Sequence, residues 1–142
     1  MLQEWWAGPK VVTRGKVHYA DKLPGFVAVQ EERPAGLVTY RIDGTGCEIV
    51  TMNSLAEGKG IGSALIEAVK NAATKAGCKR LWLITTNDNT KALRFYQKRG
   101  FKMAAVYPNA IEKSRHLKPE IPLTGNDGIP IRDEIELEMI LS

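Results

Sequence analysis

Polar and apolar positions along the chain divide its first half into short strands separated by turns. Residues 26–30 and 36–42 alternate loosely on either side of Arg33 and Pro34, which predicts an antiparallel hairpin. A second turn is predicted at residues 43–46, because Asp, Gly, Thr and Gly follow one another there. The β-branched run at residues 48–52 then predicts the next strand.

From residue 60 the pattern changes to that of an amphipathic helix. Its predicted apolar face follows the i, i+3, i+4, i+7 spacing and consists of Ile61, Ala64, Leu65, Ala68, Val69, Ala72 and Ala76. Gly77 stands where a left-handed residue ends a helix. The apolar run at residues 81–84 is typical of a strand buried on both faces, so strand, helix and strand together indicate a right-handed crossover.

A second helix and two more strands are predicted after this unit. Residues 87–90 offer several N-caps, and Gly100 provides the stop. Residues 101–106 are expected to return to a strand. The stretch from 109 to 132 is rich in proline and glycine, which predicts a long ordered loop with room for one helical turn. Residues 133–141 alternate acidic with apolar side chains and predict a half-exposed final strand.

Composition narrows the class of protein. A chain of 142 residues with 44% hydrophobic residues can bury one core, so we expect a single domain over residues 1–142. Its longest apolar run, residues 81–84, is far below the roughly 20 residues of a membrane span. Residues 1–10 lack the apolar stretch of a secretory signal, so a cytoplasmic protein is expected.

Charge and cysteine content exclude further classes. The formal charge of +4 is mild for a nucleic-acid binder and better suits a pocket for phosphates. Cys47 and Cys78 form no CxxC pair and have no histidine at metal-ligand spacing, which indicates free reduced thiols and no metal.

Three glycines at alternate positions, Gly58, Gly60 and Gly62, precede the first long helix. They let the backbone approach a ligand closely, and the helix N-terminus beyond them offers unpaired N–H groups that suit phosphate oxygens. The spacing fits neither a P-loop, which needs Ser or Thr directly after Gly-Lys, nor a GxGxxG dinucleotide motif. A tight turn with a close helix-to-strand contact is the alternative explanation of the same glycines.

A second motif follows at a fixed distance. Residues 57–62 read Glu-Gly-Lys-Gly-Ile-Gly, residues 89–96 read Asn-Thr-Lys-Ala-Leu-Arg-Phe-Tyr, and Gly100 and Phe101 follow. This order resembles the GNAT superfamily of N-acetyltransferases over roughly residues 26–106. The resemblance implies the acyl-CoA N-acyltransferase fold, an α/β (α+β) fold with a mixed, mostly antiparallel sheet and a central parallel β-α-β unit. In this chain the N-terminal half of that fold is expected to be shortened, because only residues 17–24 separate the segment 11–13 from Phe26.

The resemblance also implies acetyl-CoA as cosubstrate and assigns residues to it. Those implied to bind the cofactor are Met52, Asn53, Ser54, Glu57, Gly58, Lys59, Gly60, Ile61, Gly62, Ser63, Asn89 and Tyr96. Glu57 stands where the family usually has Arg or Gln, and Lys59 is expected to supply the missing charge. A main-chain N–H from residues 52–54 is implied to stabilise the oxyanion of acyl transfer.

Two side chains are candidates for the proton transfers. Tyr96 is the candidate acid for the departing thiolate, with a core aromatic as the alternative. Glu48 is the candidate base for the amine and is expected to share strand parity with Val50 and Met52. The alternative for Glu48 is an exposed strand carboxylate paired with a Lys or Arg. His18 and His116 are expected to be structural or solvated.

The expected function is therefore direct transfer of an acetyl group from acetyl-CoA to an amine of unknown identity, carried by a small molecule or a peptide. A non-catalytic, coenzyme A binding regulatory module of the same fold is the alternative. Neither nucleic acid nor membrane is an expected partner. Trp5 and Trp6 lie near a polar terminus and need a surface to pack on, which makes a homodimer possible.

Overall fold

A computed structural model describes residues 2–3, 11–13, 16–18, 23–30, 32–54 and 60–141. The chain groups into two compact units. The first comprises Met1–Val11, Tyr19–Leu81 and Ile140–Ser142, and the second comprises Val12–His18 and Trp82–Met139. Within the described residues, no helix has the length and apolar character needed to span a membrane. The expectation of a single domain stays a prediction.

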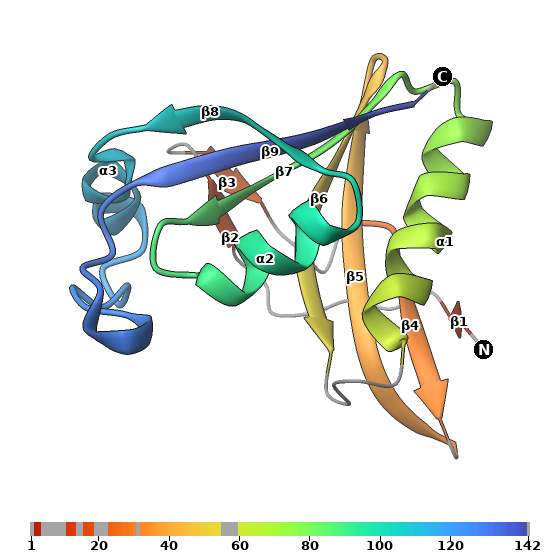
Figure 1. Cartoon of the computed structure of the whole chain (residues 1–142), viewed down its shortest axis with the longest axis horizontal. Coiled ribbons are helices and arrows are strands. Elements are labelled where there is room, and N and C mark those ends of the chain that lie inside the picture. Colours follow the sequence, from red (N-terminus) through yellow and green to blue (C-terminus); the bar gives the residue numbers. More distant parts are fainter. Residues whose placement is uncertain are drawn as a thin grey trace. The chain divides into compact units, whose positions relative to one another are not determined.

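The first unit is a sheet covered by one long helix. Its strands follow the order β1 (Leu2–Gln3), β4 (Gly25–Gln30), β5 (Arg33–Asp43) and β6 (Gly46–Ser54). Each pairs antiparallel with its neighbour. Helix α1 (Ile61–Lys75) packs along β4, β5 and β6 (Figure 1). The predicted hairpin and the predicted turn are both confirmed, and Gly44 adopts a left-handed φ of 61° in the turn between β5 and β6.

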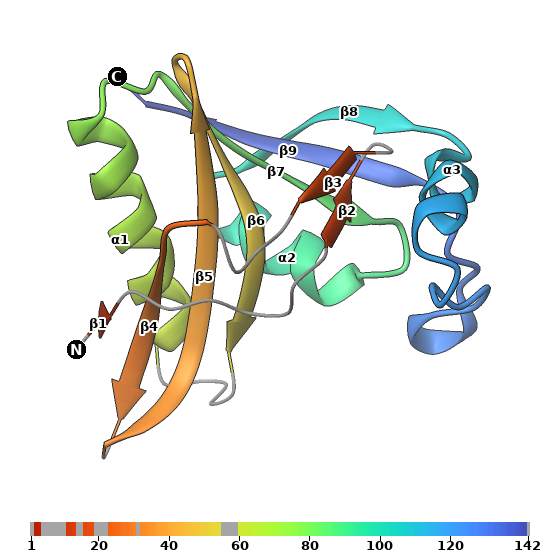
Figure 2. The same ribbon diagram turned by 180° about the vertical axis from the view of Figure 1, so that it is seen from behind.

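The first strand of this sheet is not the one we expected. Leu2 pairs with Ala28 and Gln3 with Val27, so β1 lies beside β4. The segment from which the shortened N-terminal half was counted, β2 (Val11–Thr13), pairs with β3 (Lys16–His18) in a separate two-stranded sheet (Figure 2). Two residues suffice to pair with an edge strand, and so short a run carries no alternation that a sequence pattern can detect.

A β-bulge in β6 corrects the expected parity of Glu48. Thr39 pairs with Thr51, but Tyr40 pairs with Ile49, so Val50 is an extra residue on β6. An extra residue shifts the alternation of side chains by one position. Glu48 therefore lies on the same face as Thr51 and not on that of Met52, because its partner Arg41 shares the parity of Thr39 on β5.

The buried face of α1 is rotated from the predicted one. Its buried residues are Gly62, Leu65, Ile66, Val69 and Ala73, whereas Ala64 and Ala76 are exposed. Burial of a large aliphatic side chain is worth about 1.5–3 kcal/mol, so Leu65, Ile66 and Val69 orient the helix more strongly than alanines do. Gly77, with a φ of 83°, follows the helix as predicted.

Gly36 allows α1 to approach β5 closely. A Cβ at this position would lie 2.8 Å from the Asn53 carbonyl oxygen and 2.8 Å from Cγ2 of Ile61, the first residue of α1. We expect Gly36→Ala to lower the free energy of unfolding by about 1–3 kcal/mol, because the backbone oxygen cannot give way. Urea denaturation measures this loss. A Gly36→Ala variant as stable as the parent would show that α1 moves freely at this contact.

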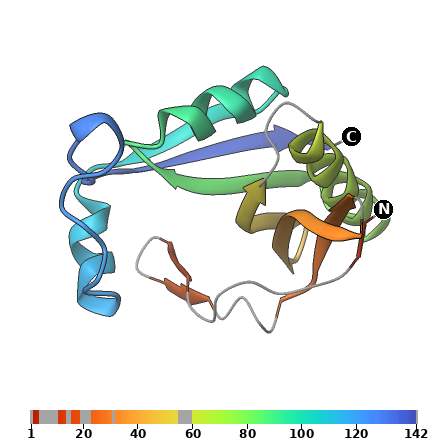
Figure 3. The same cartoon turned by 90° about the horizontal axis from the view of Figure 1, so that it is seen from below.

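The second unit places one strand between two others. Strand β9 (Glu134–Ile140) lies between β7 (Arg80–Thr86) and β8 (Lys102–Tyr107) (Figure 3). Helix α2 (Thr90–Lys98) follows β7 and contacts β8. Strands β7 and β8 and helix α2 confirm the predicted elements.

The segment from residue 109 to 132 holds more helix than predicted. Helix α3 (Ala110–Leu117) and a short 3₁₀ turn (Asn126–Gly128) both lie within it. The N-terminus of α3 is held by residues outside the helix. The Asn109 N–H donates to Asp133 Oδ1 at 2.9 Å, and the Ile111 N–H donates to the Arg132 carbonyl at 3.1 Å. These contacts join residues that are far apart in the sequence, so they leave no local pattern. The prolines and glycines of the segment therefore predict a loop.

The acidic residues of β9 are also more buried than a half-exposed strand implies. Glu134 is 2% exposed and Glu136 is 8% exposed. The Tyr107 hydroxyl donates to Glu136 Oε1 at 2.7 Å across the β8–β9 pair. A hydrogen-bonded carboxylate can be buried at low cost, so acidic residues in a strand do not reliably mark its solvent face.

Candidate active site

Strand β6 carries the candidate base, a buried carboxylate paired with a half-buried arginine. Glu48 is 2% exposed, and its Oε1 lies 3.4 Å from Nη2 of Arg41 on the adjacent strand. The alternative explanation of Glu48 expected a basic partner, which is present, and an exposed side chain, which is wrong. Thr39 and Thr51 lie on the same face and share a hydrogen bond between their hydroxyls. This face of β5 and β6 is thus lined by polar groups that hold one another in place.

The end of β6 holds three of the residues implied to bind the cofactor. Met52 pairs with Val38 and is half-buried, Asn53 pairs with Leu37 and is exposed, and Ser54 pairs with Gly36 as the last residue of the strand. Glu57, Gly58 and Lys59 were predicted to follow them in the glycine loop. These three residues lie outside the described part of the chain, so their assignment stays a prediction.

Gly60 is the N-cap of helix α1, and among the described residues no side chain caps this terminus. Gly60 has a φ of 73° and a ψ of 8°, a left-handed conformation that favours glycine. A Cβ added to Gly60 would meet no atom of the described residues within 4 Å. Ile61, Gly62 and Ser63 form the first turn, which contains no acidic side chain. The positive end of the helix dipole is therefore not offset by a carboxylate of the helix itself.

Asn89 caps α2 in the second unit. Its side-chain oxygen accepts a hydrogen bond from the Ala92 N–H at 3.1 Å, which confirms an N-cap within the predicted stretch 87–90. The side-chain amide N–H groups of Asn89 remain available among the described residues, because only the oxygen takes part in the cap. One side chain can thus stabilise the helix and still donate to a ligand.

Tyr96 is a buried aromatic on α2 with 6% exposure. Its ring makes edge-to-face contacts with Phe95 and Phe101 at centroid distances of 5.0 and 5.3 Å. Burial raises the pKa of the Tyr96 phenol well above its usual range, an effect that the nearby Arg99 partly opposes. No hydrogen bond of the hydroxyl is found within the described residues. The phenol is consequently protonated at neutral pH, as a proton donor must be.

Two histidines and two cysteines are the other titratable candidates. His116 is exposed near the end of α3, and the side chain of His18 lies outside the described residues, as do Trp5 and Trp6. Cys47 and Cys78 are free and buried, as predicted for reduced thiols. Burial, with smaller contributions from Cys78 and Glu48, raises the pKa of the Cys47 thiol to about 12, which makes it a poor nucleophile.

Sequence reasoning missed Arg41 as the partner of Glu48. The sequence does contain a signal for this partner. A two-residue turn at Gly44 and Thr45 pairs Asp43 with Gly46, and counting outward along both strands from that pair places Arg41 opposite Glu48. The bulge at Val50 had no comparable signal. Asn87 and Asp88 were read only as possible caps, yet both bind the segment that follows residue 121.

Comparison with known proteins agrees with the motifs. The model of the acetyltransferase (GNAT) family matches residues 2–101. The uncharacterized protein YdhI of Bacillus subtilis (strain 168) is 49% identical over 137 residues, which cover 96% of this chain and 86% of that protein.

Solved structures show the same fold. The IAA acetyltransferase from Bacillus cereus ATCC 14579 has a TM-score of 0.73 and 28% identity, covering 87% of this chain and 81% of that chain. A GNAT family acetyltransferase from Elizabethkingia anophelis with acetyl-CoA bound has a TM-score of 0.71 and 26% identity, covering 84% and 76%. The predicted fold class is confirmed, and the chain belongs to the acetyltransferase (GNAT) family.

Proposed function

We propose that the chain is an N-acetyltransferase that moves the acetyl group of acetyl-CoA directly onto an amine. The observation that carries this proposal is the N-terminus of α1, where left-handed Gly60 directly precedes a helical turn without acidic residues and, among the described residues, no side chain caps the helix. Main-chain N–H groups and a positive helix dipole suit a pyrophosphate. The acetyl-CoA bound to the family member from Elizabethkingia anophelis supports the same assignment.

Other predicted residues would contact the pantetheine arm of the cofactor. The strand end at Ser54 and the exposed Asn53 would offer main-chain groups to the peptide-like pantetheine arm. The free amide N–H groups of Asn89 would donate to the same arm. Glu57, Gly58 and Lys59 complete the proposed loop, with Lys59 supplying the charge that Glu57 does not.

The bulge in β6 suggests a donor for the oxyanion. An extra residue in a strand leaves its main-chain groups out of the ladder, so the N–H of Val50 is a candidate in addition to those of residues 52–54. Donors of this kind stabilise the negative charge that develops on the carbonyl oxygen in the transition state. The polar face of Glu48, Thr39 and Thr51 starts next to this bulge.

Glu48 and Tyr96 would handle the protons. An ammonium ion cannot attack a thioester, so Glu48 would accept a proton from the amine directly or through water. Tyr96 would donate a hydrogen bond or a proton to the departing sulfur. A coenzyme A binding module without catalysis needs neither a buried carboxylate nor a protonated phenol, so we favour the enzyme over this alternative. The proposed setting is the cytoplasm, and a homodimer stays a prediction.

Calorimetry and a thiol-release assay test the proposal. We expect acetyl-CoA to bind and NAD and ATP not to bind at the same concentrations, because the glycine spacing fits neither nucleotide motif. A panel of amines, from amino acids and polyamines to peptides with a free N-terminus, should include one that accelerates release of free coenzyme A. Tight binding of acetyl-CoA with no release for any class of amine would instead support the regulatory module.

Replacement of Glu48 by Gln tests the base. We expect kcat/KM to fall most at low pH and to recover in part as pH rises, because free amine then reaches the site without help. The ion pair with Arg41 complicates this test, since Glu48 is buried and breaking the pair lowers the free energy of unfolding.

Arg41→Gln is the matched control, because it breaks the same ion pair and leaves the Glu48 carboxylate in place. Both variants should melt at lower temperature, but only Glu48→Gln should change the shape of the pH profile. Parallel profiles for the two variants and the parent would leave Glu48 with a structural role alone.

A further inference from the structure

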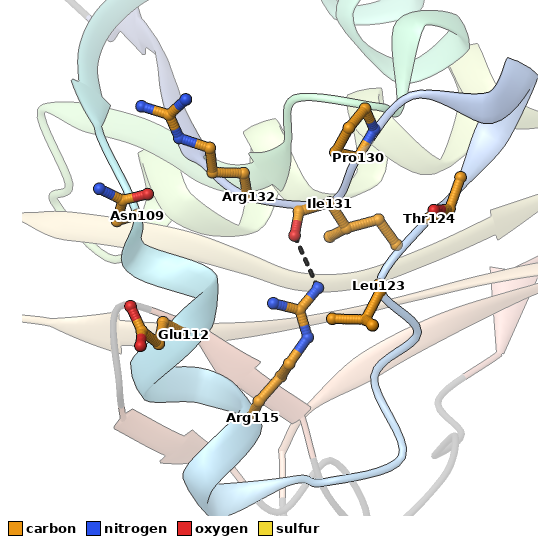
Figure 4. Close-up of a pocket in the computed structure, with 8 residues that line it drawn as sticks. All are labelled: Asn109, Glu112, Arg115, Leu123, Thr124, Pro130, Ile131 and Arg132. Carbon is orange, nitrogen blue, oxygen red and sulfur yellow. Dashed lines mark hydrogen bonds between the residues drawn. The ribbon is translucent and has the colours of Figure 1, made fainter.

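The second unit contains a cavity that none of the candidate residues above lines. It has a volume of about 560 Å³ and lies between α3 and residues 123–132 (Figure 4). Its polar side chains include Glu112 and Arg115 of α3 and Arg132, and its apolar side chains include Leu123 and Ile131. Small-molecule sites typically have volumes of about 300–1,000 Å³.

The walls of the cavity are held by hydrogen bonds across the chain. Arg115 Nη2 donates to the Ile131 carbonyl at 2.7 Å (Figure 4). Nη2 also donates to the Pro122 carbonyl at 2.8 Å, and Nε makes a longer bond to the Ile121 carbonyl. From the turn after β7, Asn87 Oδ1 accepts from the N–H groups of Arg132 and Asp133, both at 3.0 Å. A wall fixed in this way loses little further entropy when a ligand binds.

Arg115 keeps part of its guanidinium free. Of its five N–H donors, one on Nε and two on Nη2 are used, which leaves the two on Nη1. Within the described residues no carboxylate pairs with Arg115. In Figure 4 the free terminal nitrogen points toward the side of the cavity on which Asn109 and Glu112 lie. A fixed positive charge with two unused donors is suited to a carboxylate.

The remaining lining groups limit the charge of the ligand. Arg132 Nε lies 3.2 Å from Asp133 Oδ1, which offsets part of its charge. Glu112 also lines the cavity and would repel a second negative charge. A monoanion therefore fits better than a phosphate dianion. Leu123, with 73% of its surface exposed, provides an apolar side that a ligand would cover.

We propose that this cavity binds a small organic carboxylate. The carboxylate accepts hydrogen bonds from Arg115 Nη1, and the apolar body of the ligand lies against Leu123 and Ile131. The proposal does not depend on acetyl transfer, because the cavity and all its supporting contacts lie within residues 87–133 of the second unit.

Titration of the ¹⁵N-labelled full chain with hexanoate tests the proposal. Hexanoate should shift the amide resonances of residues 109–132 saturably, and hexanamide, its neutral counterpart, should bind about tenfold or more weakly because it lacks the charged hydrogen bonds. Equal affinity for the two compounds, or shifts that avoid residues 109–132, would overturn the proposal.

Substitutions at the rim distinguish charge from shape without disturbing Arg115. Leu123→Asp should weaken hexanoate binding about fivefold or more relative to Leu123→Asn, which has nearly the same shape and no charge. Glu112→Gln should tighten binding about two- to fivefold by removing a like charge. Lys113→Gln, an exposed change on α3 outside the lining, is the control and should have no effect. Failure of Glu112→Gln to tighten binding while its melting temperature is unchanged would contradict the assignment of Arg115 as the anion ligand.

Discussion

Gly60→Asp is expected to lower the affinity for acetyl-CoA by on the order of 100-fold or more while the fold survives. The substitution places a negative charge at the N-terminus of α1, where the pyrophosphate is proposed to bind, and each charge-assisted hydrogen bond lost is worth about 1.5–3 kcal/mol. The new side chain meets no atom within 4 Å of its Cβ, so a steric clash with the protein is not the cause. Calorimetry with acetyl-CoA measures the loss.

Gly60→Asn separates charge from backbone strain. Asn and Asp have the same shape, and both tolerate the left-handed conformation that Gly60 adopts at φ 73° better than other residues do. Asn should therefore reproduce any loss of stability and only part of the loss of affinity. Equal affinities for the two variants would show that charge at this helix terminus does not matter, and retention of full affinity by both would remove Gly60 from the site.

The local elements of the fold could be predicted because their signals are local. The turn at Gly44, the start of α1 at Gly60 and the cap at Asn89 each depend on a few neighbouring residues whose conformational preferences are strong. These are also the positions that carry the family resemblance. A motif of this kind indicates a backbone shape, and the structure confirms that shape where it is described.

The parts that the sequence did not predict depend on contacts between distant residues. The bulge at Val50 arises from the pairing of β6 with β5. It places Glu48 on the face of the strand opposite to the one that simple alternation predicts. Helix α3 is held at its start by Asp133, 24 residues after Asn109. The alternation of side chains along a single strand or helix reveals neither the bulge nor the contact at the start of α3.

Burial of charged groups was the second limit. Glu48 and Glu134 are each 2% exposed, although a charged residue in a strand is usually assigned to the solvent face. Glu48 is buried because Arg41 on the neighbouring strand pairs with it. Charged residues therefore need their cross-strand partners identified before a face of the sheet can be assigned.

Removal of the Tyr96 hydroxyl separates a chemical role from a packing role. Tyr96→Phe keeps the ring and its edge-to-face contacts with Phe95 and Phe101, so the fold and the affinity for acetyl-CoA should change little. If the hydroxyl assists departure of the thiolate, kcat should fall about 10- to 1,000-fold, in line with the usual contribution of a general acid. Single-turnover measurement with an accepted amine gives this rate apart from binding and product release.

The raised pKa of Tyr96 sets the expected pH dependence. Burial holds the phenol protonated, so its deprotonation should not produce a falling limb in the rate profile below about pH 10, the usual value for tyrosine. Above that pH, stability should decline, because the unfolded chain loses a proton that the buried phenol retains. Tyr96→Phe should remove part of this alkaline decline and lower kcat throughout the neutral range.

A second tyrosine provides the control for loss of a hydroxyl. Tyr40 lies on β5, is 9% exposed and stacks on Phe26, and the proposed chemistry does not use it. Tyr40→Phe should therefore leave kcat within about twofold of the parent, whatever it does to stability. A normal kcat in Tyr96→Phe with an accepted amine would assign Tyr96 to the core. A proton or hydrogen-bond donor at the sulfur requires the opposite result: kcat falls in Tyr96→Phe and not in Tyr40→Phe, and the affinity for acetyl-CoA is unchanged.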